Sequence, residues 1–323
     1  LMPQGMGPAL ASLWRLVLPG QGVGGRVAAA LARAPSGTVD AATTVPAIDL
    51  AGVARSYGSL HVLQDITFTA RRGELVSLVG PNGAGKTTLI RCISDGHERS
   101  AGRVALQGRS IGHMPPERCV RLGLGRKFQA PTVFDTLSVA ESLRIARARH
   151  ERLSPWRQAD TVLLPEAALR VMEATGLSTQ LGVTVRHLSH GARQALELAM
   201  VLAMEPSVLL LDEPTAGLTK PERTLIGGVL VQLVAEHGLC ILLIEHDLEF
   251  VREISSRIIV LHQGRIVLDG GVEEVVASEL VRTIYTGEPQ ARGEAGIPGG
   301  RAGEDGSSAT DDAGGTSAGE ATP

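Results

Sequence analysis

Apolar runs and helix-forming segments alternate through the middle of the chain. Residues 75–79, 208–211 and 239–244 are almost uninterrupted apolar stretches, which are typical of parallel strands covered on both faces. Helical patterns follow two of these runs, at residues 87–93 and 222–236. The alternation predicts an α/β fold with a mainly parallel sheet core that binds its ligands at the carboxyl ends of the strands.

Other segments alternate between apolar and polar positions instead. Residues 48–53 and 62–68 do so, and this pattern predicts half-buried antiparallel strands. Residues 258–262 and 265–269 flank a Gln-Gly turn and predict a hairpin. We therefore expect an antiparallel β subdomain beside the parallel core.

A third region is predominantly helical in pattern. From about residue 135 to 188, apolar residues recur at helical spacing, with breaks at Pro155 and Pro165. This predicts an inserted helical subdomain. Ser189 is then expected to cap a long helix that ends near Ala203.

Composition changes at both ends of the chain. Residues 1–46 are rich in Ala, Gly and Pro, and their only compact apolar run, at 14–18, is too short for a membrane span. No basic region precedes that run, so we expect no signal peptide. We predict a disordered extension here, or upstream sequence included by the choice of start site, and a disordered acidic, Gly-rich tail at 288–323. One ordered domain should occupy residues 47–287, between these two segments.

Charge and residue usage exclude several classes of protein. The 323 residues carry a formal charge of −3 and only 2% aromatic residues, which argues against nucleic acid as a partner. Cys92, Cys119 and Cys240 lack metal-like spacing and indicate free thiols in a reducing compartment. No apolar stretch approaches the ~20 residues of a membrane-spanning helix. We expect a protein that is soluble or peripheral to a membrane.

A phosphate-binding pattern lies between the first apolar run and its helix. It fits G-x-x-x-x-G-K-[ST] and consists of Gly80, Pro81, Asn82, Gly83, Ala84, Gly85, Lys86, Thr87 and Thr88. A phosphate is expected at the helix start, where free backbone N–H groups and the helix dipole face the anion. In this pattern the lysine reaches the outer phosphates and the first hydroxyl binds Mg²⁺.

Polar residues follow the two later apolar runs. Asp212 and Glu213 come directly after one strand, where the first can hold Mg²⁺ and the second can orient and deprotonate water. His246 follows the next strand and can hydrogen-bond a γ-phosphate. His187 and His190 lie three residues apart, but no third ligand stands near them, so we predict no metal site there.

Taken in order, these elements resemble the ATP-binding subunit of an ABC transporter over residues 47–287. The resemblance implies that Gln129 is the Q-loop glutamine, which senses Mg²⁺ and water and contacts the membrane subunit. It implies that Ser189 and Gly191, within the signature stretch 188–192, contact the γ-phosphate. Asp212 and Glu213 match the Walker B pair, His246 matches the switch histidine, and Tyr57 stands at the adenine-stacking position.

The same resemblance implies an assembly. In this family the signature covers the ATP of the opposite subunit, so two ATPase chains, identical or not, sandwich two nucleotides. Two membrane permease subunits and an extracytoplasmic solute-binding protein complete an importer, with the ATPases at the cytoplasmic face of the plasma membrane. Ala192 replaces the usual Gln or Glu of the signature, and Thr219 replaces a common Asp. We therefore predict an active ATPase whose two sites can be asymmetric.

Finer details concern the solute. The stretches 125–134, 188–191, 245–251 and 260–264 together resemble the branched-chain amino acid and urea importer group, and lean to its urea member. The alternatives are a soluble ABC-type ATPase that is not coupled to transport and a regulatory module that binds nucleotide without hydrolysing it. Glu213 and His246 argue against the regulatory module. A small GTPase is disfavoured because no Asn-Lys-x-Asp stretch is present.

Overall fold

The core of the protein is a six-stranded sheet. The structure is a computed structural model that describes residues 30–34, 45–127, 133–148 and 161–286. The strand order is β12-β11-β4-β10-β9-β7, and only β12 is antiparallel to its neighbour. The strands are β4 (Leu75–Val79), β7 (Leu124–Lys127), β9 (Val208–Asp212), β10 (Cys240–Ile244), β11 (Arg257–His262) and β12 (Arg265–Gly270). Because β4, β9 and β10 are buried at every position, the predicted parallel core is confirmed.

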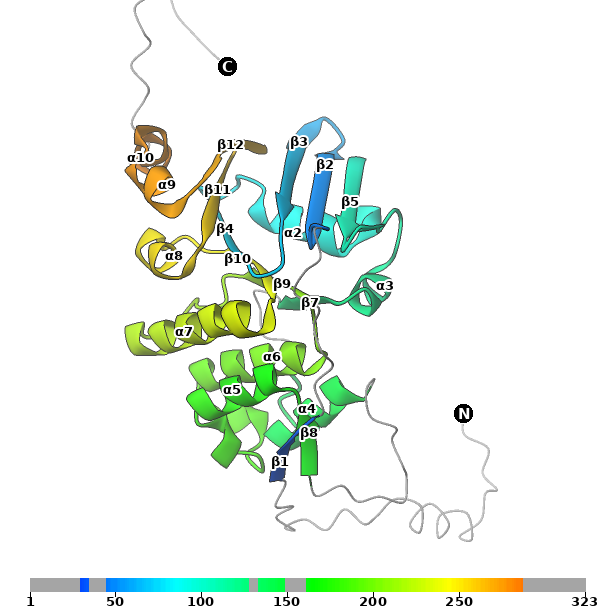
Figure 1. Cartoon of the computed structure of the whole chain (residues 1–323), viewed down its shortest axis with the longest axis vertical. Helices are drawn as coiled ribbons and strands as arrows, with labels where there is room; N and C mark the ends of the chain where they lie inside the picture. The colour runs from blue at the N-terminus through cyan, green and yellow to red at the C-terminus, as the bar shows by residue number, and fades with distance from the viewer. Residues whose placement is uncertain (1–29, 35–44, 128–132, 149–160, 287–323) are drawn as a thin grey trace, which may run out of the picture. The chain divides into compact units, whose positions relative to one another are not determined.

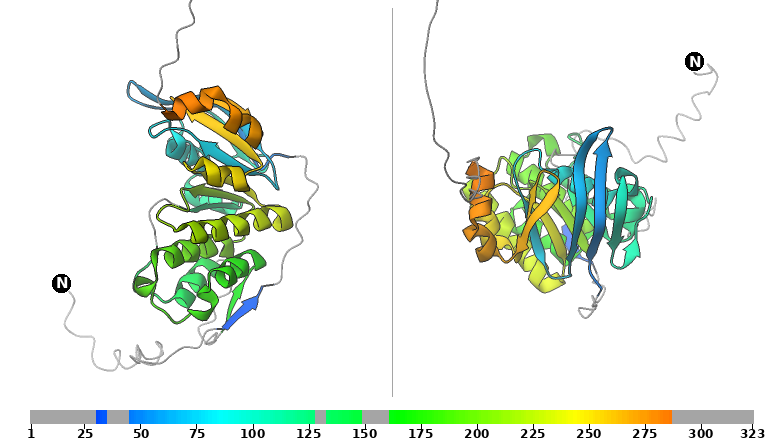
Figure 2. Two further views of the ribbon diagram at one scale, coloured as in Figure 1. Left: turned by 90° about the vertical axis from the view of Figure 1, so that its left-hand side faces the viewer. Right: turned by 90° about the horizontal axis from the view of Figure 1, so that it is seen from above.

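A second, antiparallel sheet lies beside this core. Its order is β3-β2-β5-β6, with β2 (Ile48–Tyr57), β3 (Leu60–Ala70), β5 (Ala101–Leu106) and β6 (Arg109–Ser110). Its apolar face packs on helix α2 (Lys86–Ser94). β3 contacts β12, so the two sheets meet along these strands, as the view from above shows (Figure 2). The antiparallel pairing confirms the prediction for this region.

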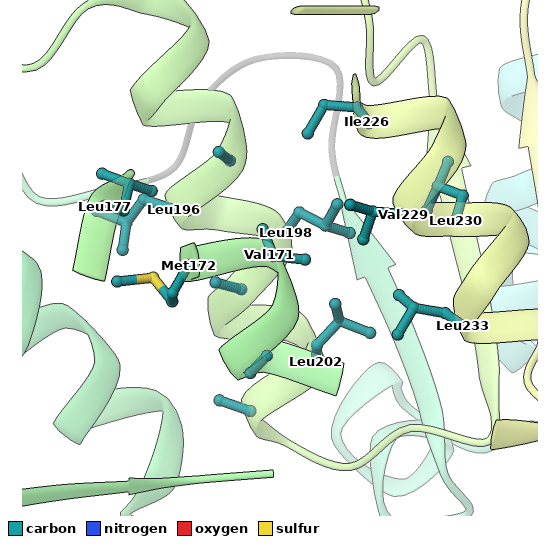
Figure 3. Close-up of a cluster of buried hydrophobic side chains, with 14 of the residues drawn as sticks. Val171, Met172, Leu177, Leu196, Leu198, Leu202, Ile226, Val229, Leu230 and Leu233 are labelled. Atoms are coloured by element: carbon teal, nitrogen blue, oxygen red, sulfur yellow. The ribbon is translucent and has the colours of Figure 1, made fainter. Parts of the chain in front are cut away.

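Helices α5, α6 and α7 share one buried cluster. Helix α5 (Glu166–Ala174) packs against both α6 (His190–Ala203) and α7 (Lys220–His237), and leucines and valines of the three helices lie side by side in the cluster (Figure 3). Short helices connect the elements, and α9 and α10 end the described chain. The remaining helices are α3 (Pro116–Arg121), α4 (Val139–Arg147), α8 (Leu248–Ile254), α9 (Val272–Ala277), α10 (Glu279–Thr286), η1 (Gly96–Glu98), η2 (Leu177–Thr179) and η3 (Val185–His187).

One strand contradicts the prediction of a disordered extension over residues 1–46. β1 (Ala30–Arg33) pairs in parallel with β8 (Thr161–Leu164), a strand inside the predicted helical subdomain (Figure 1). Ala34 is buried, and its N–H donates to the carbonyl of Leu164. The prediction was wrong for these residues because the open edge of β8 supplies the hydrogen bonds that the segment cannot make alone.

Two further expectations concern cysteines and membrane spans. Cys92, Cys119 and Cys240 are free and buried. Burial raises the pKa of the Cys92 thiol to about 11 and that of Cys240 to about 12. Within the described residues, no helix has the length and apolar character that crossing a membrane requires.

Candidate functional site

The phosphate-binding pattern forms a loop between β4 and α2. Gly80, Gly83 and Gly85 all have positive φ angles, which glycine adopts without steric cost. A Cβ on Gly85 would lie 2.8 Å from the side chain of Leu63. Helix α2 starts without a side-chain cap and without an acidic residue in its first turn. Its first N–H groups and its dipole are therefore available to an anion.

The loop also holds its lysine close to its own backbone. Lys86 is buried, and its ammonium donates to the carbonyl of Gly80 at 2.6 Å and to that of Pro81 at 3.0 Å. Burial lowers the pKa of Lys86, while the nearby carboxylates of Glu213 and Asp212 raise it. Asn82 and Gly83 are exposed at the tip of the loop, Ala84 is buried, and Thr88 is half-buried.

The two predicted Mg²⁺ ligands of the loop and of β9 meet. Asp212, at the end of β9, is only 2% exposed, and its carboxylate accepts a hydrogen bond from the Thr87 hydroxyl. Burial raises the pKa of Asp212, with a smaller contribution from Glu213 in the same direction. A buried carboxylate beside a hydroxyl is a donor set that fits a hard divalent cation.

Glu213 follows Asp212 in an unusual backbone conformation. Its φ of 48° lies in the left-handed region, which non-glycine residues rarely occupy and which is often found at functional sites. The N–H of Glu213 donates to the carbonyl of Ile244 at the end of β10, 3.0 Å away. This bond fixes Glu213 beside the segment that carries His246.

His246 is exposed to solvent, and the residue before it is held in place by a hydrogen bond. Its side chain is 64% exposed, whereas the preceding Glu245 is buried. Glu245 accepts a hydrogen bond from the hydroxyl of Thr215, at 2.6 Å, and that threonine lies three residues after Asp212. Burial raises the pKa of Glu245. The carboxyl ends of β4, β9 and β10 thus bring the loop, Asp212, Glu213 and His246 to one edge of the sheet.

Tyr57 ends strand β2 with 45% of its surface exposed. The guanidinium of Arg55 lies 4.3 Å from the centre of its ring, which is a cation–π contact. Strands β2 and β3 form a hairpin. A cavity of about 450 Å³ opens beside it, between Leu60–Val62, Gly83 and the turn from β11 to β12. The cavity adjoins the phosphate loop at Gly83.

The signature residues form the exposed start of α6. The Ser189 side chain accepts from the N–H of Ala192 at 3.2 Å, so the predicted N-cap is confirmed. Gly191 lies against Glu222, since a Cβ there would be 2.3 Å from the Glu222 carboxylate. That carboxylate accepts from the hydroxyl and N–H of Thr219. Thr219 is thus the N-cap residue of α7, and it forms a capping box with Glu222.

Not every predicted site residue can be placed. Gln129 lies outside the described residues. Helix α6 packs against α4, α5 and β7, whereas α2 contacts β2, β3 and β9. The signature and the phosphate loop therefore stand on different supporting elements of the chain.

Two features of the site escaped the sequence analysis. The hydroxyl of Tyr285, on α10, accepts a hydrogen bond from the N–H of Gly80 at 2.9 Å. Lys127 and Glu197 form a buried ion pair at 3.5 Å that joins the end of β7 to α6. The sequence holds one hint of this pair. Lys127 is a charged residue in a largely buried strand, two residues before Gln129.

Known proteins with this arrangement are ATP-binding proteins of transporters. The family model described as ABC transporter matches residues 63–216. The branched-chain amino acid transport protein LivG of Salmonella typhimurium is 32% identical over 254 residues, covering 75% of this chain and 98% of LivG. Its counterpart BraF of Pseudomonas aeruginosa is 30% identical over 252 residues, with the same coverage.

Solved structures agree with the sequence relatives. MJ1267, an ATP-binding cassette of an ABC transporter, superposes with a TM-score of 0.65 at 25% identity, over 75% of this chain and 99% of that one. Fold and site together define a phosphate-loop nucleotide-binding domain with an added helical subdomain. The chain belongs to the ATP-binding proteins of ABC transporters, a family of ATPases. The predicted fold class is confirmed.

Proposed function

We propose that this chain is the ATP-hydrolysing subunit of an importer, in which ATP is enclosed between two ATPase subunits. The observation that carries the proposal is the meeting of the phosphate loop, the Thr87–Asp212 pair, Glu213 and His246 at one edge of the sheet. Phosphoryl transfer needs this combination of anion cradle, cation site and water-orienting carboxylate. The domain limits of 47–287, with a helical subdomain at about 135–188, remain part of this proposal.

The nucleotide would lie along the loop and the β2–β3 hairpin. Its phosphates would sit at the start of α2 with Lys86 at the outer ones, and its adenine would stack on the exposed ring of Tyr57. The cavity beside Val62 and Gly83 gives room for the base and ribose. Thr87 and Asp212 would hold Mg²⁺, with Gln129 completing the site. The cation would neutralise charge on the transferring phosphoryl group.

Hydrolysis would rest on two side chains. Glu213 would orient water and accept its proton, and its left-handed φ of 48° follows directly on the end of β9 at Asp212. His246 would donate a hydrogen bond to the γ-phosphate, because it projects from the segment that the Glu245–Thr215 bond fixes.

The second ATPase subunit would complete each site. Ser189 and Gly191 start α6 on an accessible surface, where N–H groups and the helix dipole favour the γ-phosphate of an opposing chain. Because Ala192 departs from the family signature, we expect a non-identical partner with a fuller one. A purified homodimer that hydrolysed ATP as fast as the whole complex would remove the basis for this asymmetry.

We propose that the membrane subunits contact this chain beside β7. A groove of about 480 Å³ lies between α2, α3, β7 and the end of α6, and both charged and apolar side chains line it, including Arg91, Glu117, Val120 and Met204. β7 ends two residues before Gln129. Since the family resemblance assigns permease contact to that glutamine, the permease would rest against this groove. The chain would then work as a peripheral subunit at the cytoplasmic face of the plasma membrane.

Branched-chain amino acids are the solute that the relatives favour. LivG and BraF carry that name, and this chain covers 98% of each. The D-allose import protein AlsA of Escherichia coli is also 32% identical, over 247 residues, so identity to one ATPase does not fix the solute. Urea or short amides remain the alternative that the sequence details favoured. A soluble ATPase uncoupled from transport is the competing function.

Reconstitution separates these functions. The full complex would be placed in proteoliposomes, and its ATP hydrolysis measured with the binding protein loaded in turn with branched-chain amino acids, urea and short amides. We expect stimulation by one class, which would identify the solute. Hydrolysis by this chain that responds neither to the permeases nor to any loaded binding protein would favour the soluble ATPase.

A further inference from the structure

The first residue of the phosphate loop is held by the last described helix. The N–H of Gly80 donates to the hydroxyl oxygen of Tyr285, 2.9 Å away, across 205 positions of the sequence. Tyr285 lies near the end of α10 (Glu279–Thr286). Burial raises the pKa of its hydroxyl, so Tyr285 keeps its proton at neutral pH.

The Gly80 amide needs such a partner because the sheet ends just before it. β4 pairs with β11 as far as Val79, which lies opposite Val260. Gly80 then leaves the strand direction with a φ of 148°, close against the Leu261 carbonyl, where a Cβ would come within 2.0 Å. An amide at this depth costs free energy if it stays unpaired. The Tyr285 hydroxyl satisfies it.

Packing explains how the hydroxyl reaches this place. Val281 of α10 is buried in a cluster with Val79, at the end of β4, and with Val260 and Val275. Ile284 and Tyr285 pack on the edge of the same cluster. The helix is thus anchored on the strand that leads into the loop, and its register places the phenol oxygen at Gly80.

The carbonyl of Gly80 faces the lysine. It accepts from the Lys86 ammonium at 2.6 Å. A single residue, Gly80, therefore links the Tyr285 hydroxyl to the side chain that is expected to meet the outer phosphates. A shift of Gly80 would move the carbonyl that orients Lys86.

We propose that Tyr285 is a positioning residue for ATP binding, whose hydroxyl fixes Gly80 and through it the phosphate loop and Lys86. The inference rests on the proposed role of the loop. It makes α10 part of the nucleotide site, although the helix begins more than 30 residues after His246.

The variant Tyr285→Phe removes one oxygen and keeps the ring. We expect the dissociation constant and KM for ATP to rise by about five- to tenfold, the range expected when one buried amide loses its partner, with a smaller change in kcat. Hydrogen exchange of the peptide that contains Gly80, followed by mass spectrometry in the full chain, should become faster, while peptides of α6 and α7 stay unchanged.

Val275→Ala is the matched control in the same cluster, on the neighbouring helix α9. It removes packing from the cluster but leaves Val281, which anchors α10, and the Tyr285 hydroxyl in place, so it should lower the melting temperature without weakening ATP binding. Wild-type ATP affinity in Tyr285→Phe would overturn the proposal. Equal weakening of ATP binding in Val275→Ala would also overturn it, since packing alone would then explain the effect.

A third variant keeps this test separate from the function itself. Lys86→Ala should lose most ATP affinity if the loop binds phosphate. Normal affinity in Lys86→Ala would contradict the proposed nucleotide site, whereas a deficit in Lys86→Ala with none in Tyr285→Phe would contradict only the role of Tyr285.

Discussion

Asp212 illustrates how a functional carboxylate is held at a cost to folding. The residue is buried, and its pKa is raised, mainly by that burial. A raised pKa means that folding favours the protonated acid, so at neutral pH the ionised carboxylate destabilises the folded chain. Such a cost is expected at a cation site, where the positive charge of the bound ion balances the ionised carboxylate.

Asp212→Asn should therefore stabilise the chain while disabling it. At pH 7 and without nucleotide, we expect the melting temperature to rise by about 2–4 °C, corresponding to ~1 kcal/mol in a domain of this size. Mg²⁺-dependent hydrolysis should fall sharply because the amide is a poor cation ligand. Thermal scans at pH 7 and pH 4 provide the check, since the gain should shrink as the native carboxyl takes up its proton. A lower melting temperature at pH 7 would contradict this account.

Single residues were predictable where a local pattern carries the chemistry. Lys86, Asp212 and Glu213 follow from strand ends and glycine spacing, and the structure brings them to one edge. Tyr285 was not predictable, because its contact with Gly80 depends on how α10 docks on β4 and leaves no local pattern.

Among the elements, β1 shows the limit of reading strands from sequence. Ala-Leu-Ala-Arg contains good helix formers and only one large apolar residue. It becomes a strand because β8 offers an open edge and Leu31 packs on the cluster around α5 and α6. Strand formation here is decided by tertiary context, which outweighs propensity. The long buried runs of β9 and β10 are apolar almost throughout, so their own sequence favours a strand, and they were predicted correctly.

Two truncations test the contribution of β1. Removing residues 1–29 keeps the strand, whereas removing residues 1–44 deletes it together with the buried Ala34. We expect the first to melt like the full chain and the second to melt at least about 4 °C lower, because backbone pairing and apolar burial are lost. The exposed Arg33–Glu166 pair should add little to this difference. Identical melting temperatures would show that β1 contributes nothing to stability.

At the scale of the whole molecule, a buried ion pair connects the sheet to the signature helix. Lys127 lies at the end of β7 and Glu197 lies on α6, with side chains 1% and 6% exposed. Burial lowers the pKa of Lys127, and Glu197, Asp212 and Glu245 oppose that shift. Buried pairs often stabilise little overall, yet losing one partner is costly because a charge stays behind.

Lys127→Met is expected to destabilise the chain by roughly 3–5 kcal/mol, because the Glu197 carboxylate would remain buried without that cation. The double variant Lys127→Met with Glu197→Met should recover most of this loss. Urea unfolding of both variants supplies the comparison. A double variant no more stable than the single one would argue against direct coupling between the two side chains.

We propose that ATP hydrolysis by this chain depends on Glu213 as the general base. The most direct measurement is single-turnover hydrolysis of ATP by the assembled complex, comparing the wild type with Glu213→Gln. We predict that the variant turns over roughly 10²-fold more slowly or worse, as loss of a general base does, and keeps ATP bound in a stable two-subunit complex. Hydrolysis at the wild-type rate in Glu213→Gln would contradict the account.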